Sequence, residues 1–143
     1  MLNQILMGGF VSLVNFGIHA LVTGIIVVAT NHVAAATDDL RVFVRVTSLM
    51  MVTLVVLMIT HVIEISVWAS YFTFAGIETS KASAFEFAFE NYTALGYGDV
   101  VGRGAHRMIG PITALNGLLL IGWSVAIIFE VMRMAELQIG RKR

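Results

Sequence analysis

Three long stretches of the chain are almost continuously apolar, and polar residues gather between them. The first covers about residues 5–30 and holds no charged side chain, the second about 42–74 and the third about 108–134. Each exceeds the roughly 20 helical residues that cross a bilayer core about 30 Å thick. The pattern predicts an all-α integral membrane protein with three spanning helices, because a spanning segment must satisfy its backbone groups internally.

A fourth segment, residues 83–92, is too short to span and mixes aromatic with acidic side chains. Residues 93–99 follow it with the sequence Thr-Ala-Leu-Gly-Tyr-Gly-Asp, and the third apolar stretch comes next. Non-helical backbone at membrane depth is tolerated only when it is buried in protein or lines a watery cavity. We therefore expect a re-entrant helix at 83–92 that returns through a loop at 93–99.

The composition also places the chain in lipid. Apolar residues make up 58% of it and charged residues 13%, which is about half the charged share of a soluble domain. A formal net charge of zero gives no indication of a nucleic-acid partner, and the lack of cysteine excludes disulfides and thiolate metal sites. We expect the bilayer as a partner, and neither nucleic acid nor an organic substrate.

Basic residues predict the orientation, since they concentrate in cytoplasmic loops. With a cytoplasmic C-terminus, six of them lie inside and three outside. The inner six are Arg41, Arg45, Arg133, Arg141, Lys142 and Arg143, and the outer three are Lys81, Arg103 and Arg107. This bias predicts a multi-pass protein of the plasma (inner) membrane whose N-terminus lies outside.

The loop at 93–99 resembles the selectivity filter of potassium channels, which reads Thr-Thr-Val-Gly-Tyr-Gly-Asp, and the resemblance extends over about residues 72–134. It implies a homotetramer in which rings of backbone carbonyls replace the water around K⁺. Glycines at 96 and 98 supply the positive φ angles that such a ribbon needs. No cofactor is implied apart from K⁺ ions in the filter. The implied coordinating residues are Thr93, Ala94, Leu95, Gly96, Tyr97 and Gly98, with K⁺ at Ala94, Leu95, Gly96 and Tyr97.

Two filter positions depart from the family pattern. Ala94 replaces the second threonine, so the innermost site keeps its carbonyl and loses a hydroxyl, and Leu95 replaces valine. The prediction is a passive K⁺ channel, not an enzyme. The alternatives are a weakly selective monovalent cation channel and a non-conducting accessory membrane subunit.

The resemblance also implies residues that support the filter and the gate. Glu90 and Asp99 would meet behind the filter and share a proton, because two close carboxylates do not both ionise easily. Gly117 and Gly122 fall on two glycines of the inner helix. They serve either as a hinge or as sites of close helix packing, where small residues are common in membranes.

Further along the same helix, Val125 and Phe129 recur at helical spacing. They either pack against neighbouring helices or face the axis, where four copies form an apolar constriction that closes by dewetting. Pro111 lies early in the third stretch, so the helix begins near it or bends there.

The expected organisation divides the chain into three parts. A first span and a cytoplasmic loop occupy 1–41, a pore module occupies 42–134, and a short basic tail occupies 135–143. Within the pore module we expect an outer helix at 42–75, a pore helix at 83–92, a filter at 93–99 and an inner helix at 106–134.

Polar side chains inside the spans are the remaining chemistry. His61 and Glu64 share one face of the second span with Trp68, and ionisable groups in a membrane are expensive and usually paired or functional. They form a pair that locks this helix to the first span or the pore helix, a metal site completed by His19, or a proton sensor. A membrane enzyme using the pair is a distant alternative.

Asn15, His19 and Thr23 recur every four residues on the first span. We interpret this stripe as helix–helix contact, because polar side chains join helices in membranes.

Overall fold

Four helices make up the computed structural model, which describes residues 2–36, 41–96 and 107–140. No strand occurs within these ranges. Three of the helices are long and apolar enough to cross a membrane, which confirms the prediction of an all-α fold with three spans. In chain order the helices are α1 (Leu2–Ala36), α2 (Val42–Phe74), α3 (Lys81–Tyr92) and α4 (Ile109–Gly140).

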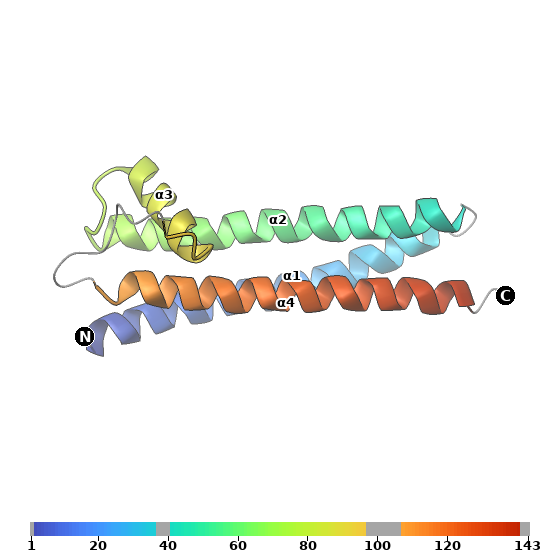
Figure 1. The fold of residues 1–143 in the computed structure, drawn as a ribbon, viewed down its shortest axis with the longest axis horizontal. Helices are drawn as coiled ribbons and strands as arrows, with labels where there is room; N and C mark the ends of the chain where they lie inside the picture. The colour runs from blue at the N-terminus through green and yellow to red at the C-terminus, as the bar shows by residue number, and fades with distance from the viewer. Residues whose placement is uncertain (1, 37–40, 97–106, 141–143) are drawn as a thin grey trace.

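The three long helices lie side by side, and α3 is inserted at one end of the bundle (Figure 1). α1 and α4 run in one direction and α2 in the other, so the N-terminus lies at the α3 end and the C-terminus at the opposite end. α3 packs against both α2 and α4. Its last residue, Tyr92, is only 1% exposed. The short helix therefore ends inside the bundle.

The observed helix bounds differ from the predicted ones at the ends. α3 begins at Lys81 rather than at residue 83, and α4 continues beyond residue 134 to Gly140. α4 starts at Ile109, so Pro111 lies in its first turn. Proline is tolerated there because the first N–H groups of a helix have no partner inside the helix.

A Schellman motif ends α2 and turns the chain toward α3. The N–H of Gly76 donates to Thr73 O at 3.2 Å, and the N–H of Ile77 donates to Phe72 O at 3.0 Å. Gly76 has a φ of 67°, the left-handed conformation that this motif requires. Ile77 also packs against the apolar cluster that contains Phe72, and a hydrophobic contact of this kind often accompanies the motif.

Hydroxyl groups within the spans bond to their own helices. Thr30, Thr53, Thr60 and Thr113 each donate to the carbonyl four residues earlier, at 2.8–2.9 Å. A helix that cannot bond to water satisfies polar side chains in this way. These threonines therefore fit apolar surroundings.

Two apolar clusters form the interior. One lies around α3 and includes Trp68, Phe72 and Phe87. The other lies nearer the opposite end, where Leu57 and Ile127 pack together with residues of α1. Each long helix also has buried polar residues, some of which fall between the two clusters in sequence. Among these are His19 on α1, Glu64 on α2 and Ser124 on α4.

Candidate functional site

A second Schellman motif ends α3 and leads into the filter-like loop. The N–H of Ala94 donates to Asn91 O at 3.0 Å, and the N–H of Leu95 donates to Glu90 O at 3.1 Å. Ala94 therefore occupies the position that Gly76 occupies after α2, and its φ is 55°. A left-handed conformation costs an L-residue about 1–2 kcal/mol. The sequence offered no signal for this motif, because alanine is not a typical C-terminal residue for it.

The next left-handed residue is Gly96, with a φ of 54°. This agrees with the positive φ expected there from the sequence. Positive φ thus occurs at two positions separated by one residue, Ala94 and Gly96. The other filter residues, Tyr97, Gly98 and Asp99, lie outside the described residues.

In the single chain this loop is open on one side. Ala94, Leu95 and Gly96 are all exposed, and apart from its chain neighbours no described residue lies within 4 Å of a Cβ built on Gly96. Glu90 is half-buried at the end of α3. Its expected partner, Asp99, is not described, so the Glu90–Asp99 pair stays a prediction.

Gly117 is a packing position, because α4 touches the end of α3 there. A Cβ on Gly117 would overlap the carbonyl oxygen of Tyr92 and lie 2.7 Å from its carbonyl carbon. Two turns earlier, a Cβ on Gly110 would lie 2.6 Å from Oδ1 of Asn91. The last two residues of α3, Asn91 and Tyr92, therefore pack against Gly110 and Gly117 on one face of α4.

Gly122 is different, since nothing lies within 4 Å of a Cβ built on it. Val125 and Phe129 share its side of α4 and are 61% and 67% exposed in the single chain. Gly117 is thus a site of close helix packing, one of the two interpretations of these glycines. Gly122 makes no such contact with the described residues.

A buried polar network joins all four helices, and Glu64 is its centre. The Glu64 side chain is 0% exposed. Its Oε1 lies 2.8 Å from Nδ1 of His19 on α1, and its Oε2 lies 3.1 Å from Nδ1 of His61 one turn earlier on α2. The Tyr92 hydroxyl of α3 donates to the same Oε2. Three polar groups from three helices thus surround one carboxylate.

The network reaches α4 through two residues. Ser124 Oγ lies 2.9 Å from Nε2 of His61 and 3.5 Å from Nε2 of His19. Oδ1 of Asn116 accepts from Asn15 of α1 at 3.1 Å and from the indole of Trp68 at 2.9 Å. These contacts give most of the buried polar atoms partners, as a low-dielectric interior favours, although Asn15 Oδ1 and Asn116 Nδ2 are buried without a hydrogen-bond partner among the described residues.

The sequence found part of this network. His61, Glu64 and Trp68 share a face as expected, and the stripe on α1 does contact other helices, since Asn15 also donates to Glu64 O at 3.2 Å. The roles of Tyr92 and Ser124 were missed. An aromatic hydroxyl at the end of the pore helix was the available signal for Tyr92, whereas a lone serine in an apolar span gives none.

The network is not arranged as a metal site. Among the described residues, no group of three or more His, Cys, Asp or Glu side chains is placed to hold a metal ion. The metal interpretation of His61, Glu64 and His19 is therefore not supported. Close contacts among the three residues are hydrogen bonds instead.

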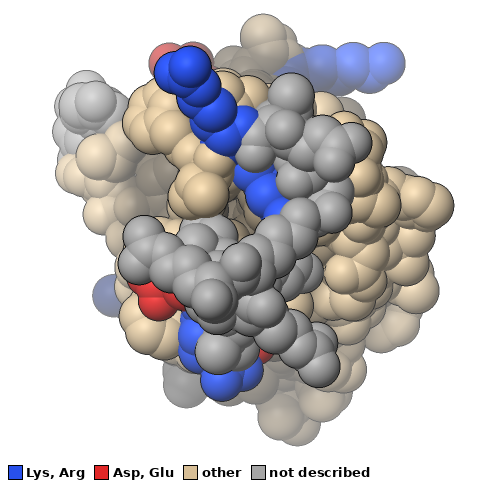
Figure 2. Space-filling view, turned by 90° about the vertical axis from the view of Figure 1, so that its right-hand side faces the viewer, with Lys and Arg blue, Asp and Glu red and all other residues tan. Residues whose placement is uncertain are grey.

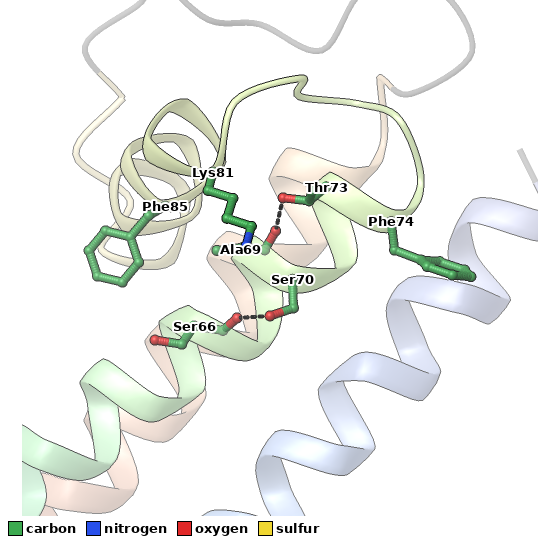
Figure 3. A pocket seen from close by; sticks show the side chains of 7 residues that line it. All are labelled: Ser66, Ala69, Ser70, Thr73, Phe74, Lys81 and Phe85. Atoms are coloured by element: carbon green, nitrogen blue, oxygen red, sulfur yellow. Dashed lines mark hydrogen bonds between the residues drawn. The ribbon is translucent and has the colours of Figure 1, made fainter.

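A separate pocket of about 500 Å³ lies between α2 and α3 (Figure 3). Lys81 extends from α3 toward Ala69 of α2, and it is the one charged residue in the lining. The hydroxyls of Ser70 and Thr73 donate to carbonyls of their own helix, at 2.7 and 3.0 Å. Neither His61 nor Glu64 lines this pocket.

The two ends of the bundle differ in charge. Figure 2 looks onto the end of the bundle opposite to α3 and shows basic and acidic side chains there. Arg41 and Arg45 lie at the start of α2, and Arg133 lies near the end of α4. The α3 end carries Lys81 and Arg107 among the described residues.

The fold and the site define a class of protein: a multi-pass membrane protein with a short helix and a glycine-bearing loop between its last two spans. The model of a protein family described as "Ion channel" matches residues 58–134, which is more than half of the chain. The chain belongs to this ion channel family. Neither curated proteins nor solved structures gave a match to the chain.

Proposed function

We propose that this protein is a homotetrameric channel that conducts K⁺ passively through a filter of backbone carbonyls. The observation that carries the proposal is the backbone after α3, where Ala94 and Gly96 both have positive φ. Alternation of this kind points successive carbonyls toward one side. The coordinating residues would be 93–98, with K⁺ at Ala94, Leu95, Gly96 and Tyr97.

The mechanism follows from ion hydration. A cation enters a filter only when fixed oxygens replace its water, and it leaves only when binding is not too tight. Several sites in a row meet both conditions, because ions in neighbouring sites repel each other onward. No covalent step is needed, so transport is driven by the K⁺ gradient alone.

Four copies are proposed because one chain supplies only one wall of such a cage. The exposed loop and the apolar outer side of α4 fit this assembly. Leu115, Leu118, Val125 and Phe129 are 55–67% exposed in the single chain. In the tetramer these residues face lipid, neighbouring chains or the pore, and Val125 and Phe129 would form the cytoplasmic constriction.

We propose the orientation that the basic residues predict, with the N-terminus outside and the C-terminus in the cytoplasm of a plasma (inner) membrane. Opposite placement of the two termini supports it. So does the position of Arg41, Arg45 and Arg133 at the C-terminal end. The pore module would then be entered from outside at the α3 end.

The test is purification followed by reconstitution. Native mass measurement in detergent should show four copies, and proteoliposomes should release K⁺ in a manner blocked by Ba²⁺, which has nearly the size of K⁺ and twice its charge. A monomer or dimer that still conducts would overturn the carbonyl cage. A pure tetramer without any cation flux would favour an accessory subunit.

A weakly selective cation channel is the second candidate, and Ala94 favours it, because the innermost site lacks a side-chain oxygen. Ala94→Ser restores a hydroxyl without a branched Cβ, and Ala94→Gly is the matched control without oxygen. Internal Ba²⁺ should block the serine variant more tightly than wild type and leave the glycine variant near wild type. Equal block of all three would mean that residue 94 does not border an ion site.

A further inference from the structure

Two histidines share one serine hydroxyl inside the polar network. Ser124 Oγ lies between Nε2 of His61, at 2.9 Å, and Nε2 of His19, at 3.5 Å. On the other side of each ring, Nδ1 faces a Glu64 oxygen, at 3.1 Å for His61 and 2.8 Å for His19. The four side chains therefore close a ring of hydrogen bonds that links α1, α2 and α4.

The hydrogens in this ring can be counted. An ionised carboxylate only accepts, so each Nδ1 must carry a hydrogen to bond Glu64. Tyr92 donates its single hydrogen to Glu64, and its oxygen, 2.8 Å from His61 Nδ1, can accept in turn. If both imidazoles are neutral, both Nε2 atoms are acceptors. Ser124 has one hydrogen and satisfies only one of them.

A single additional proton removes this deficit. With a proton on one Nε2, that nitrogen donates to Ser124 Oγ, and the Ser124 hydroxyl donates to the other Nε2. Every polar atom of the ring then has a partner, which matters because an unsatisfied buried group is costly. The charges also cancel, since one imidazolium balances the Glu64 carboxylate.

We propose that His19, His61, Glu64 and Ser124 form an intramembrane proton-binding site that holds one exchangeable proton shared by the two histidines. Trp123 supports a cation at this place, because its ring centroid lies 5.2 Å from that of His19. His61 is the less buried of the two histidines, with 18% of its side chain exposed in the single chain against 1% for His19.

The groups around the site come from all four helices. α1 brings His19, α2 brings His61 and Glu64, and α3 brings the Tyr92 hydroxyl. The α4 residues with a hydrogen bond or ring contact to the histidines are Ser124 and Trp123, and neither is titratable. Loss of the proton leaves Glu64 unbalanced. A second proton adds a positive charge that Glu64 does not balance and leaves the Ser124 hydroxyl hydrogen without an acceptor in the ring.

This site would act on the pore through Tyr92, a step that rests on the proposed function. Tyr92 is bonded to Glu64 through its side chain, while its carbonyl packs on Gly117 and its next neighbour is filter residue Thr93. A change in the number of bound protons therefore alters the hydrogen bonding of Glu64, which holds the end of α3 through Tyr92. We expect K⁺ flux to be highest when one proton is bound and to fall toward both acid and alkaline pH.

The direct test measures protonation in the bilayer by solid-state NMR of ¹⁵N-histidine. The full chain carries His32→Gln and His106→Gln, so that only His19 and His61 report. At neutral pH one imidazolium per chain is expected, and it should disappear on alkalinisation. Two neutral rings at neutral pH would overturn the site, and so would two rings protonated at Nε2 only.

Two variants test whether the imidazolium depends on the negative charge of Glu64. Glu64→Gln removes the charge that the proton balances, so its spectrum should show no imidazolium. Glu130→Gln is the matched control, since Glu130 is exposed on α4 and should leave the imidazolium unchanged. An imidazolium that survives Glu64→Gln would contradict the balance.

Flux against pH then tests the link to the pore. A two-sided pH profile in wild type, flattened in Glu64→Gln, supports the link. A pH-independent flux beside a clear imidazolium would overturn the link and keep the site. An imidazolium in a protein that conducts no cation would instead overturn the proposed channel function while the proton site stands.

Discussion

Tyr92 connects the filter-like loop with the buried polar network. Its side chain belongs to the network, and the loop begins at the next residue, Thr93. The network is buried: Glu64 is 0% and His19 1% exposed. The described part of the loop is exposed: Leu95 is 57% exposed, and no described residue other than the chain neighbours lies within 4 Å of a Cβ built on Gly96. The network is buried within the single chain, whereas the described part of the loop is exposed.

This difference separates two kinds of task. A group that holds helices together must find its partners in its own chain, because an unsatisfied polar atom inside a membrane is expensive. A backbone that coordinates a passing ion needs an unoccupied face, which further copies of the chain complete. The exposed loop and the buried network are therefore both expected in a channel subunit.

The largest effect is expected at Gly96. Gly96→Ala places a Cβ on a residue with a φ of 54°, so the ribbon must leave the left-handed region or carry strain of about 1–2 kcal/mol in each chain. We expect K⁺ flux in proteoliposomes to disappear, while circular dichroism shows unchanged helix content.

Gly76→Ala is the matched control, because Gly76 has a φ of 67° and is equally free of neighbours within 4 Å. It should lose similar stability and keep its flux. Equal flux in the two variants would show that strain at residue 96 is irrelevant to conduction.

The next effect is expected where the two regions meet on α4. Gly117→Ala drives a Cβ into the Tyr92 carbonyl, and overpacking of this kind costs about 1–3 kcal/mol. The thermal unfolding midpoint in detergent should fall, and flux should fall with it. Gly122→Ala meets no neighbour and should unfold like wild type. If Gly117→Ala also unfolded like wild type, the close approach of α3 and α4 would be refuted.

An effect of similar size on stability is expected from Tyr92→Phe, which keeps the ring and removes one donor to Glu64. Hydrogen bonds to charged groups contribute about 1.5–3 kcal/mol. Tyr71→Phe is a control on α2 with a less buried ring. Thermal unfolding of the two variants gives the comparison, and equal midpoints would mean that the Tyr92 hydroxyl does not hold α3 to Glu64.

The smallest effect is a gain in stability. Ala94→Gly relieves a left-handed alanine at the end of α3, offset by the greater freedom of glycine in the unfolded chain, and a net gain of about 0.5–1 kcal/mol is expected. Calorimetry of the purified protein measures it. A loss of stability would show that the second Schellman motif is not strained at Ala94.

The spans and the loop could be predicted from the sequence because their signals are local. An apolar run of sufficient length predicts a spanning helix, and a glycine at position 96 indicates that the backbone there has a positive φ. The helix ends were harder, since α4 continues into the polar segment up to Gly140. Nothing local to residues 135–140 shows whether a helix continues after an apolar stretch.

The network was only half predictable for a related reason. His61 and Glu64 are one turn apart, so their contact is visible in the sequence. The partner at Oε1 of Glu64 is His19, on another helix, and helix packing alone decides which polar residues meet. Ala94 shows a further limit, because its conformation follows from the Schellman bonds at the end of α3 and not from its own preference.

The central claim is that the residues after α3 select K⁺ in an assembled channel. The most direct measurement is the reversal potential of purified protein in a bilayer with K⁺ on one side and Na⁺ on the other. The account predicts a current that reverses near the K⁺ equilibrium potential and is blocked by Ba²⁺. A current that reverses near zero, or that follows the anion gradient, would contradict it.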